Sequence, residues 1–187
     1  MKLKKAMLAL VCALALVVGS VMGTMAYLTS KTETVVNTFT VGNVAITLDE
    51  ADIDDSTADK DRDIANSYKL IPGQTYAKDP TVHVSSTSED CYLFVKVTNN
   101  LTSVIVDNIE TQILGNGWIK TETAGVYAHE PVSKGTDVVV FENITVLDSA
   151  TNESLNAVNG NQITVVAYAV QAEGLEMAEA FEAANIQ

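Results

Sequence analysis

The sequence predicts an all-β protein, an antiparallel β-sandwich or barrel that ends in one short helix. Two observations carry this prediction. Apolar and polar residues alternate with a period of two over much of the chain, which is the pattern of strands with one buried face. Turn-forming residues separate these runs at Pro72-Gly73, Gly115-Asn116-Gly117, Gly135 and Asn159-Gly160-Asn161. Roughly seven to nine strands are expected from this spacing.

The alternating runs give the positions of the expected strands. The long runs are residues 37–50, 81–86, 91–99, 136–148 and 161–173, and the shorter candidates are 104–114, 117–122 and 125–131. In 91–99 the alternation is clearest, because one face is apolar (Cys91, Leu93, Val95, Val97) and the other is mixed (Tyr92, Phe94, Lys96, Thr98). This pattern is typical of a half-buried strand.

The first 26 residues have the three parts of a secretory signal peptide. Lys2, Lys4 and Lys5 give a positive start, an uncharged apolar stretch follows, and Thr24-Met25-Ala26 supplies the small residues of a cleavage site. We expect cleavage after Ala26, so that Tyr27 begins the mature protein. The apolar stretch nearly reaches the roughly 20 residues that a membrane span needs, so a retained anchor is the alternative.

The mature chain would be one strongly acidic domain. Cleavage after Ala26 leaves 187 minus 26, or 161, residues (27–187), which is the usual size of a single domain. Loss of three lysines lowers the basic residues from 11 to 8 against 24 acidic residues, so the net charge falls from −13 to about −16. This charge argues against nucleic acid as a partner, because phosphates require a basic surface. Only Cys91 remains, so no internal disulfide can form.

Two segments depart from the strand pattern. Residues 48–67 are rich in acidic side chains and are expected to form a solvated loop or a short helix. Residues 175–184 contain helix formers, with Leu175, Ala178 and Phe181 at helical spacing, and are expected to form a terminal helix.

The acidic loop gives the candidate metal ligands of the sequence. Asp59, Asp61 and Asp63 match the first, third and fifth ligand positions of an EF-hand loop. The match then fails, because Ile64 stands where the loop needs glycine and Leu70 stands where it needs a bidentate glutamate. We expect a solvated face and no bound cofactor, with weak divalent binding by the three aspartates as the alternative.

No catalytic motif is present. His129-Glu130 begins a zinc-protease pattern, but Ser133 replaces the second histidine. His83 alternates with two valines and is expected to face solvent, and Cys91 has the pattern of a buried small apolar residue. The sequence therefore predicts a protein that is not an enzyme.

The segment after the cleavage site is suited to form a strand. Residues 27–44 contain five threonines and four valines, and the charges of Lys31 and Glu33 cancel. This neutral segment can pair within its own domain as a first strand. Alternatively, it can add as a strand to the sheet of the next subunit, a head-to-tail contact that propagates as a filament.

Five stretches in this order resemble the TasA/camelysin (CalY) family of exported proteins from Gram-positive bacteria. They are the lysine-led signal that ends in Gly23-Thr24-Met25-Ala26, and then NTFTVGNVAITLDE, KLIPGQTYAKDPTVHV, DCYLFVKVTN and ITVVAYAVQAEG. The similarity covers nearly the whole chain and is weakest across the acidic loop and over residues 100–160.

The resemblance implies a jelly-roll β-sandwich that is processed by a SipW-type signal peptidase and secreted to the cell surface or the extracellular matrix. It also implies biofilm-matrix fibres in which each subunit passes an N-terminal strand to the next, with itself as main partner and other matrix proteins as further partners. Carried onto this sequence, cleavage falls between Ala26 and Tyr27, and the donor strand consists of Tyr27, Leu28, Thr29, Ser30, Lys31, Thr32, Glu33, Thr34, Val35 and Val36. The metalloprotease activity described for camelysins is not carried over, because no zinc motif is present to receive it.

Two other functions remain open at this point. The same sandwich could be a monomeric surface module that binds carbohydrate or a host protein, with exposed aromatic residues such as Trp118 or Tyr127 lining its site. A secreted camelysin-like protease is the third possibility, and it predicts proteolysis that a chelator abolishes.

Overall fold

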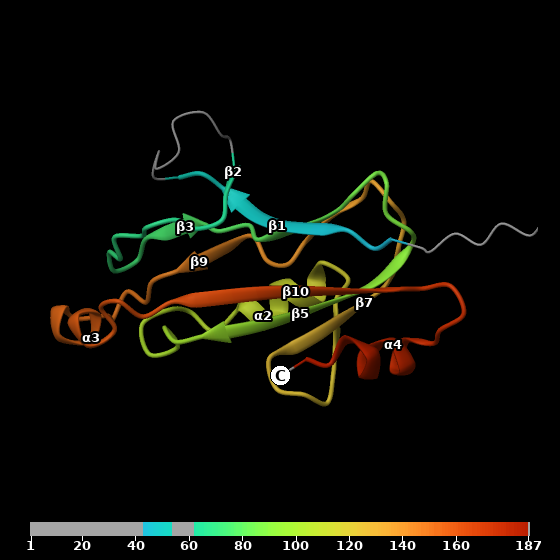
Figure 1. Cartoon of the computed structure of the whole chain (residues 1–187). Helices are drawn as coiled ribbons and strands as arrows, with labels where there is room; N and C mark the ends of the chain where they lie inside the picture. Colours follow the sequence, from blue (N-terminus) through green and yellow to red (C-terminus); the bar gives the residue numbers. More distant parts are fainter. Residues whose placement is uncertain (1–42, 54–61, 187) are drawn as a thin grey trace, which may run out of the picture. The chain divides into compact units, whose positions relative to one another are not determined.

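The strands of the structure form two four-stranded antiparallel sheets and one two-stranded sheet (Figure 1). The computed structural model describes residues 43–53 and 62–186. Every described residue belongs to one compact unit, Val41–Gln187. The expected signal peptide, the cleavage site, the donor segment and Asp59 and Asp61 lie outside the described residues, as does the middle of the acidic segment, residues 54–61.

The first sheet has the strand order β2-β1-β4-β8, and all its neighbours are antiparallel. Its strands are β1 (Ile46–Ala51), β2 (Arg62–Asp63), β4 (Thr81–Val84) and β8 (Asp137–Val139). The second sheet has the order β10-β5-β7-β6. It consists of β5 (Cys91–Asn99), β6 (Ile119–Lys120), β7 (Val126–Val132) and β10 (Ile163–Gln171). The third sheet pairs β3 (Thr75–Ala77) with β9 (Asn143–Thr145).

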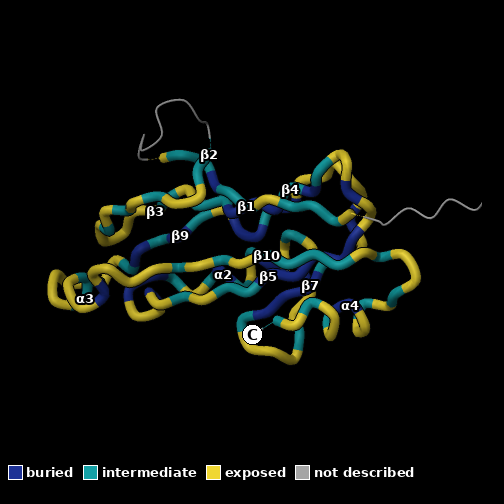
Figure 2. Tube along the Cα trace, viewed as in Figure 1, coloured by how far each residue is buried: buried dark blue, intermediate teal, exposed yellow. Residues whose placement is uncertain are grey.

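One apolar core joins the two large sheets. Val82 and Val84 of the first sheet and Leu93 and Val95 of the second sheet are all almost completely buried in it. Figure 2 shows the buried residues concentrated between the sheets. The protein is therefore mostly β, with antiparallel sheets and a few short helices, and this packing is consistent with an all-β sandwich.

The expected terminal helix is present as α4 (Met177–Ala184), and it covers the outer face of the second sheet. There Phe181 packs edge to face on Phe94 of β5, with ring centroids 5.5 Å apart. Because the helix covers this face, the first half of β5 is buried on both sides, and the half-buried pattern predicted for it was wrong there. No helix in the described part of the chain is long and apolar enough to cross a membrane.

The strand predicted at 104–114 was wrong. This segment holds one isolated bridge, from Ile105 to Val146, and then the helix α2 (Ile109–Gly115). Ile109 and Ile113 are the buried residues of α2, and a spacing of four residues places them on one face of a helix. In a strand this even spacing would also put them on one face, so their burial alone does not separate the two structures.

The single run predicted at 136–148 divides between two sheets. It contributes β8 to the first sheet and β9 to the third, and Val140 and Phe141 between them are both fully buried. Two consecutive buried side chains break the alternation of a strand. They mark the point where the chain passes from the first sheet to the third. Strands β2 and β3 and the helix α3 (Asn152–Ala157) were not predicted. Helix α3 begins with a capping box, in which Thr151 and Ser154 bond each other's backbone N–H groups.

Candidate assembly site

Strand β10 lies at an edge of the second sheet, and its backbone shows which groups face outward. Beyond its two ends, the N–H of Asn100 donates to the carbonyl of Gln162 (3.1 Å) and the N–H of Ala172 donates to the carbonyl of Asp90 (2.9 Å). In an antiparallel ladder such pairs recur at every second residue. The even-numbered residues of β10 therefore bond to β5, and the odd-numbered residues, such as Ala167, direct their N–H and C=O groups away from the sheet.

No strand in the described part of the chain pairs with this outer edge of β10. The side chains of the same odd-numbered residues turn toward the shared core and are only partly buried: Ile163, Val165, Ala167 and Ala169. Unpaired backbone groups and incompletely buried apolar side chains thus coincide on one strand. This is the combination that an added strand would complete.

Strand β1 presents a similar edge, and it lies beside β10 in the fold. Its odd-numbered residues bond to β4, because Ala45 accepts from Ser85 at the start of this ladder (2.9 Å). Ile46 and Leu48 therefore face away from β4 with their backbone, and their partly buried side chains also pack on the shared core. We call the two edges, Val44–Leu48 and Ile163–Gln171, the seam. Figure 2 shows both strands mainly at intermediate burial.

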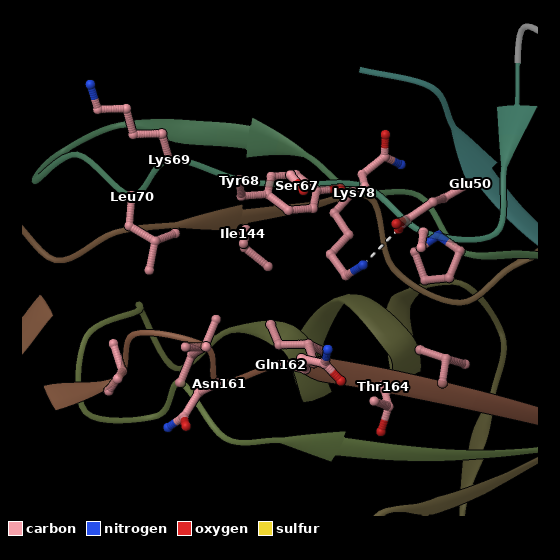
Figure 3. Close-up of a pocket in the computed structure, with 18 of the residues that line it drawn as sticks. Glu50, Ser67, Tyr68, Lys69, Leu70, Lys78, Ile144, Asn161, Gln162 and Thr164 are labelled. Atoms are coloured by element: carbon pink, nitrogen blue, oxygen red, sulfur yellow. Dashed lines mark hydrogen bonds and ion pairs between the residues drawn. The ribbon is translucent and has the colours of Figure 1, made fainter. Parts of the chain in front are cut away.

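A cleft of about 970 Å³ lies at the end of the seam where β10 begins. Figure 3 shows Tyr68, Leu70 and Lys78 on one wall and Asn161, Gln162 and Thr164 on the other. Its apolar lining also includes Leu48, Leu101, Ile144, Leu155, Val158 and Val165. The shared core is thus open to the cleft at this end of the seam.

An ion pair lies in the wall of this cleft. The Nζ of Lys78 donates to Oε2 of Glu50 at 2.6 Å, and the two side chains are only 11% and 8% exposed (Figure 3). The same Nζ lies 5.4 Å from the ring centre of Tyr68, a favourable position for a cation over an aromatic face. Neither charged group is well hydrated, so the ammonium of Lys78 and the carboxylate of Glu50 each depend on the other for stabilisation.

A second polar cluster covers the outer face of the first sheet. Arg62 of β2 contacts Asp49 of β1, donates from Nη1 to Asp79 Oδ2 at 2.9 Å, and donates from Nη2 to Thr81 Oγ1 at 3.0 Å. Burial raises the pKa of Asp49, but hydrogen bonds from Arg62 and His83 outweigh it and hold that pKa below its usual value. The cluster ties the short strand β2 to β1 and to the start of β4.

His83 completes this cluster from β4. Its Nδ1 lies 2.7 Å from Asp137 Oδ1 of β8, and its Nε2 lies 2.9 Å from Asp49 Oδ1 of β1. Burial lowers the pKa of His83, but the hydrogen bonds and charges of the two aspartates outweigh it, so the pKa lies above its usual value. The expectation that His83 simply faces solvent was therefore wrong, since its side chain is 25% exposed and bonded at both nitrogens.

The other candidates from the sequence do not form a reactive centre with one another. Cys91 is free and fully buried, as predicted, and burial raises the pKa of its thiol. His129 packs against the Trp118 ring and bonds the carbonyl of Glu130. Asp63, the one described member of the aspartate trio, lies in β2 opposite Glu50. Among the described residues, no group of histidine, cysteine and acidic side chains has the arrangement of a metal site.

The aromatic residues considered for a ligand site are not exposed. Trp118 is 2% exposed, and its Nε1 donates to the carbonyl of Val139 at 2.9 Å. Tyr127 is 6% exposed, and burial, together with the charge of Glu110, raises its pKa to about 12. Both belong to the shared core, so the prediction that they could line a surface binding site was wrong.

Comparison of the chain with protein-family models, with curated proteins and with solved structures finds no match. The candidate site therefore depends on the geometry of the seam alone. The sequence did not point to β10 as an edge strand.

Proposed function

We propose that this protein is a secreted structural protein that polymerises into extracellular matrix fibres by N-terminal donor-strand exchange. The observation that carries the proposal is the unpaired edge of β10, on which outward backbone groups coincide with partly buried apolar side chains. The resemblance to the TasA/camelysin family supports the same function. With it we propose the finer features that it implies: a jelly-roll topology, an exposed acidic loop, and export from a Gram-positive cell after cleavage by a SipW-type signal peptidase.

The proposed donor matches this edge in length. Strand β10 has nine residues, and the donor segment 27–36 has ten. A fully paired donor would use the outward N–H and C=O groups along the whole strand. The edge of β1 is shorter, since β1 pairs with β2 from Glu50 onward and only the residues before it stay unpaired on that side. The β10 edge is therefore the better acceptor.

One face of the donor segment is free of charge, as a strand added against the core requires. In a strand, residues 28, 30, 32, 34 and 36 share one face, and they are Leu, Ser, Thr, Thr and Val, with no charge. The opposite face carries Lys31 and Glu33. An added strand would turn the uncharged face toward the core and leave the two charges in water, where they need no buried partner.

The donor and acceptor surfaces differ, so the contact is head to tail. Each subunit that receives a strand at β10 still has its own N-terminal segment to pass on, and the chain of contacts does not close. Cleavage of the signal peptide would control when the donor strand can add to another subunit. While the apolar signal holds residue 27 at the membrane, the donor cannot reach a neighbour, and cleavage after Ala26 releases it. This function needs no cofactor, no catalytic residue and no nucleic acid, and the protein's main partner is another copy of itself.

Removal of the donor tests this function. We expect the mature protein 27–187 to form filaments as its concentration rises, and a variant that lacks residues 27–36 to stay monomeric. Electron microscopy and size-exclusion chromatography measure the assembly, and circular dichroism checks that the truncated protein keeps its β structure. Filaments from the truncated protein would contradict donor-strand exchange. A mature protein that is monomeric at every concentration would favour the surface binding module, and chelator-sensitive hydrolysis of casein would favour the protease.

A further inference from the structure

His83 is held between carboxylates of two different strands, one on each side of β4. Asp49 of β1 faces its Nε2, and Asp137 of β8 faces its Nδ1. Of the other charged groups in the cluster, Arg62 of β2 contacts Asp49, and Asp79, just before β4, binds Arg62. Apart from His83 itself, β4 contributes no acidic or basic residue to the cluster, because its sequence is Thr-Val-His-Val.

The geometry requires a specific charge state of the imidazole. A neutral imidazole donates from one nitrogen and accepts at the other, whereas an imidazolium donates from both. A carboxylate only accepts, so both contacts can be hydrogen bonds only while the ring is protonated. After the proton is lost, one of the two aspartates faces a lone pair at less than 3 Å. That contact then becomes repulsive.

We propose that His83 is a pH-dependent clasp: its protonated ring bonds Asp49 of β1 and Asp137 of β8 at the same time, and loss of the proton breaks one of these two side-chain bonds while the backbone pairing of the strands remains. The proposal does not depend on fibre assembly. Arg62 continues to neutralise Asp49 after His83 has lost its charge, whereas Asp137 has no other ion pair among the described residues. Asp137 is also the more exposed carboxylate, 64% against 26% for Asp49, so water can replace its contact with His83, and this contact is the one that is lost first.

The direction of the pH effect follows from the raised pKa of His83. A group whose pKa is higher in the folded state stabilises the fold fully below its unfolded pKa, about 6.5. Its contribution is lost as the pH rises through the folded-state value. Stability should therefore decrease above pH 6.5, in a range where the aspartates of the cluster stay ionised.

Two measurements test the clasp, and the chain offers a matched control because it has only two histidines. The first is the melting temperature of the purified protein between pH 6 and 9. We expect a fall on the order of 2–4 °C that His83→Gln removes and His129→Gln retains. The same fall in His83→Gln, or no fall in the unchanged protein, would overturn the proposal.

The second measurement is the NMR titration of the His83 ring, which does not need the His83→Gln variant to fold. We expect this ring to titrate above pH 6.5 and Asp137→Asn to shift its midpoint to lower pH. Because Asp137 is largely exposed, this variant should fold normally. A midpoint at or below 6.5, or one that Asp137→Asn leaves unchanged, would contradict the clasp.

Discussion

Ala167→Pro is expected to abolish filament formation and to leave the subunit folded. The N–H of Ala167 points away from the second sheet, so proline at this position removes no bond of the β10–β5 ladder. It removes a donor at the centre of the edge that we propose as acceptor, and its ring blocks the approach of another backbone. We expect no filaments by electron microscopy at concentrations at which the unchanged mature protein assembles.

The neighbouring residue supplies the control for this substitution. Tyr168 is paired with Phe94, and its backbone bonds inward to β5, so Tyr168→Pro breaks the ladder and should lower the melting temperature strongly. Ala167→Pro should change it much less, because proline is tolerated on the open side of an edge strand. An Ala167→Pro protein that is folded and still forms filaments would exclude β10 as the acceptor.

Lys78→Met should destabilise the fold by about 3–5 kcal/mol, the cost of leaving a buried charge without its partner. Methionine keeps most of the apolar stem of the lysine but removes the ammonium group that Glu50 contacts at 2.6 Å. Thermal or urea unfolding measures the loss. Lys120→Met is the matched control. Lys120 pairs with Glu110 at 2.8 Å, but both side chains are about half exposed, so its loss should cost far less stability than the loss of Lys78.

A second substitution separates charge from packing. If the cost of Lys78→Met comes from the unpaired carboxylate, Glu50→Gln in the same protein should recover a large part of it. Equal stability of Lys78→Met and Lys120→Met would show that the buried pair does not contribute as proposed. No recovery on adding Glu50→Gln would assign the cost to packing in the cleft.

Alternation in the sequence was sufficient to place several strands. The predicted runs at 81–86, 91–99 and 161–173 each contain an observed strand, and the run at 125–131 overlaps β7, which ends one residue later. The alternation pattern failed where the buried residues belong to a helix, and where the chain passes from one sheet to another. Ile109 and Ile113 lie on a helix, and the buried pair Val140 and Phe141 joins two sheets. Local pattern does not contain this information, because it depends on which element covers which face.

Of the two parts of the proposed assembly site, only the donor segment 27–36 could be suggested from the sequence, and the acceptor edge of β10 could not. The β-prone, neutral segment after Ala26 is visible in the sequence, whereas the open edge of β10 depends on strand order, which is set by contacts between distant residues. The His83 clasp was missed for the same reason. Its partners Asp49 and Asp137 are 34 and 54 residues away, so no local motif links them.

Amide hydrogen exchange tests the central claim most directly, because it reads the acceptor strand residue by residue. The truncated protein that lacks residues 27–36 would be measured alone and with an excess of a synthetic peptide of that sequence. We predict that the peptide slows exchange at the outward amides of Val165, Ala167 and Ala169, while the amides already bonded to β5 change little. Unchanged exchange along β10, or protection at the open edge of β8 instead, would contradict strand addition at this site.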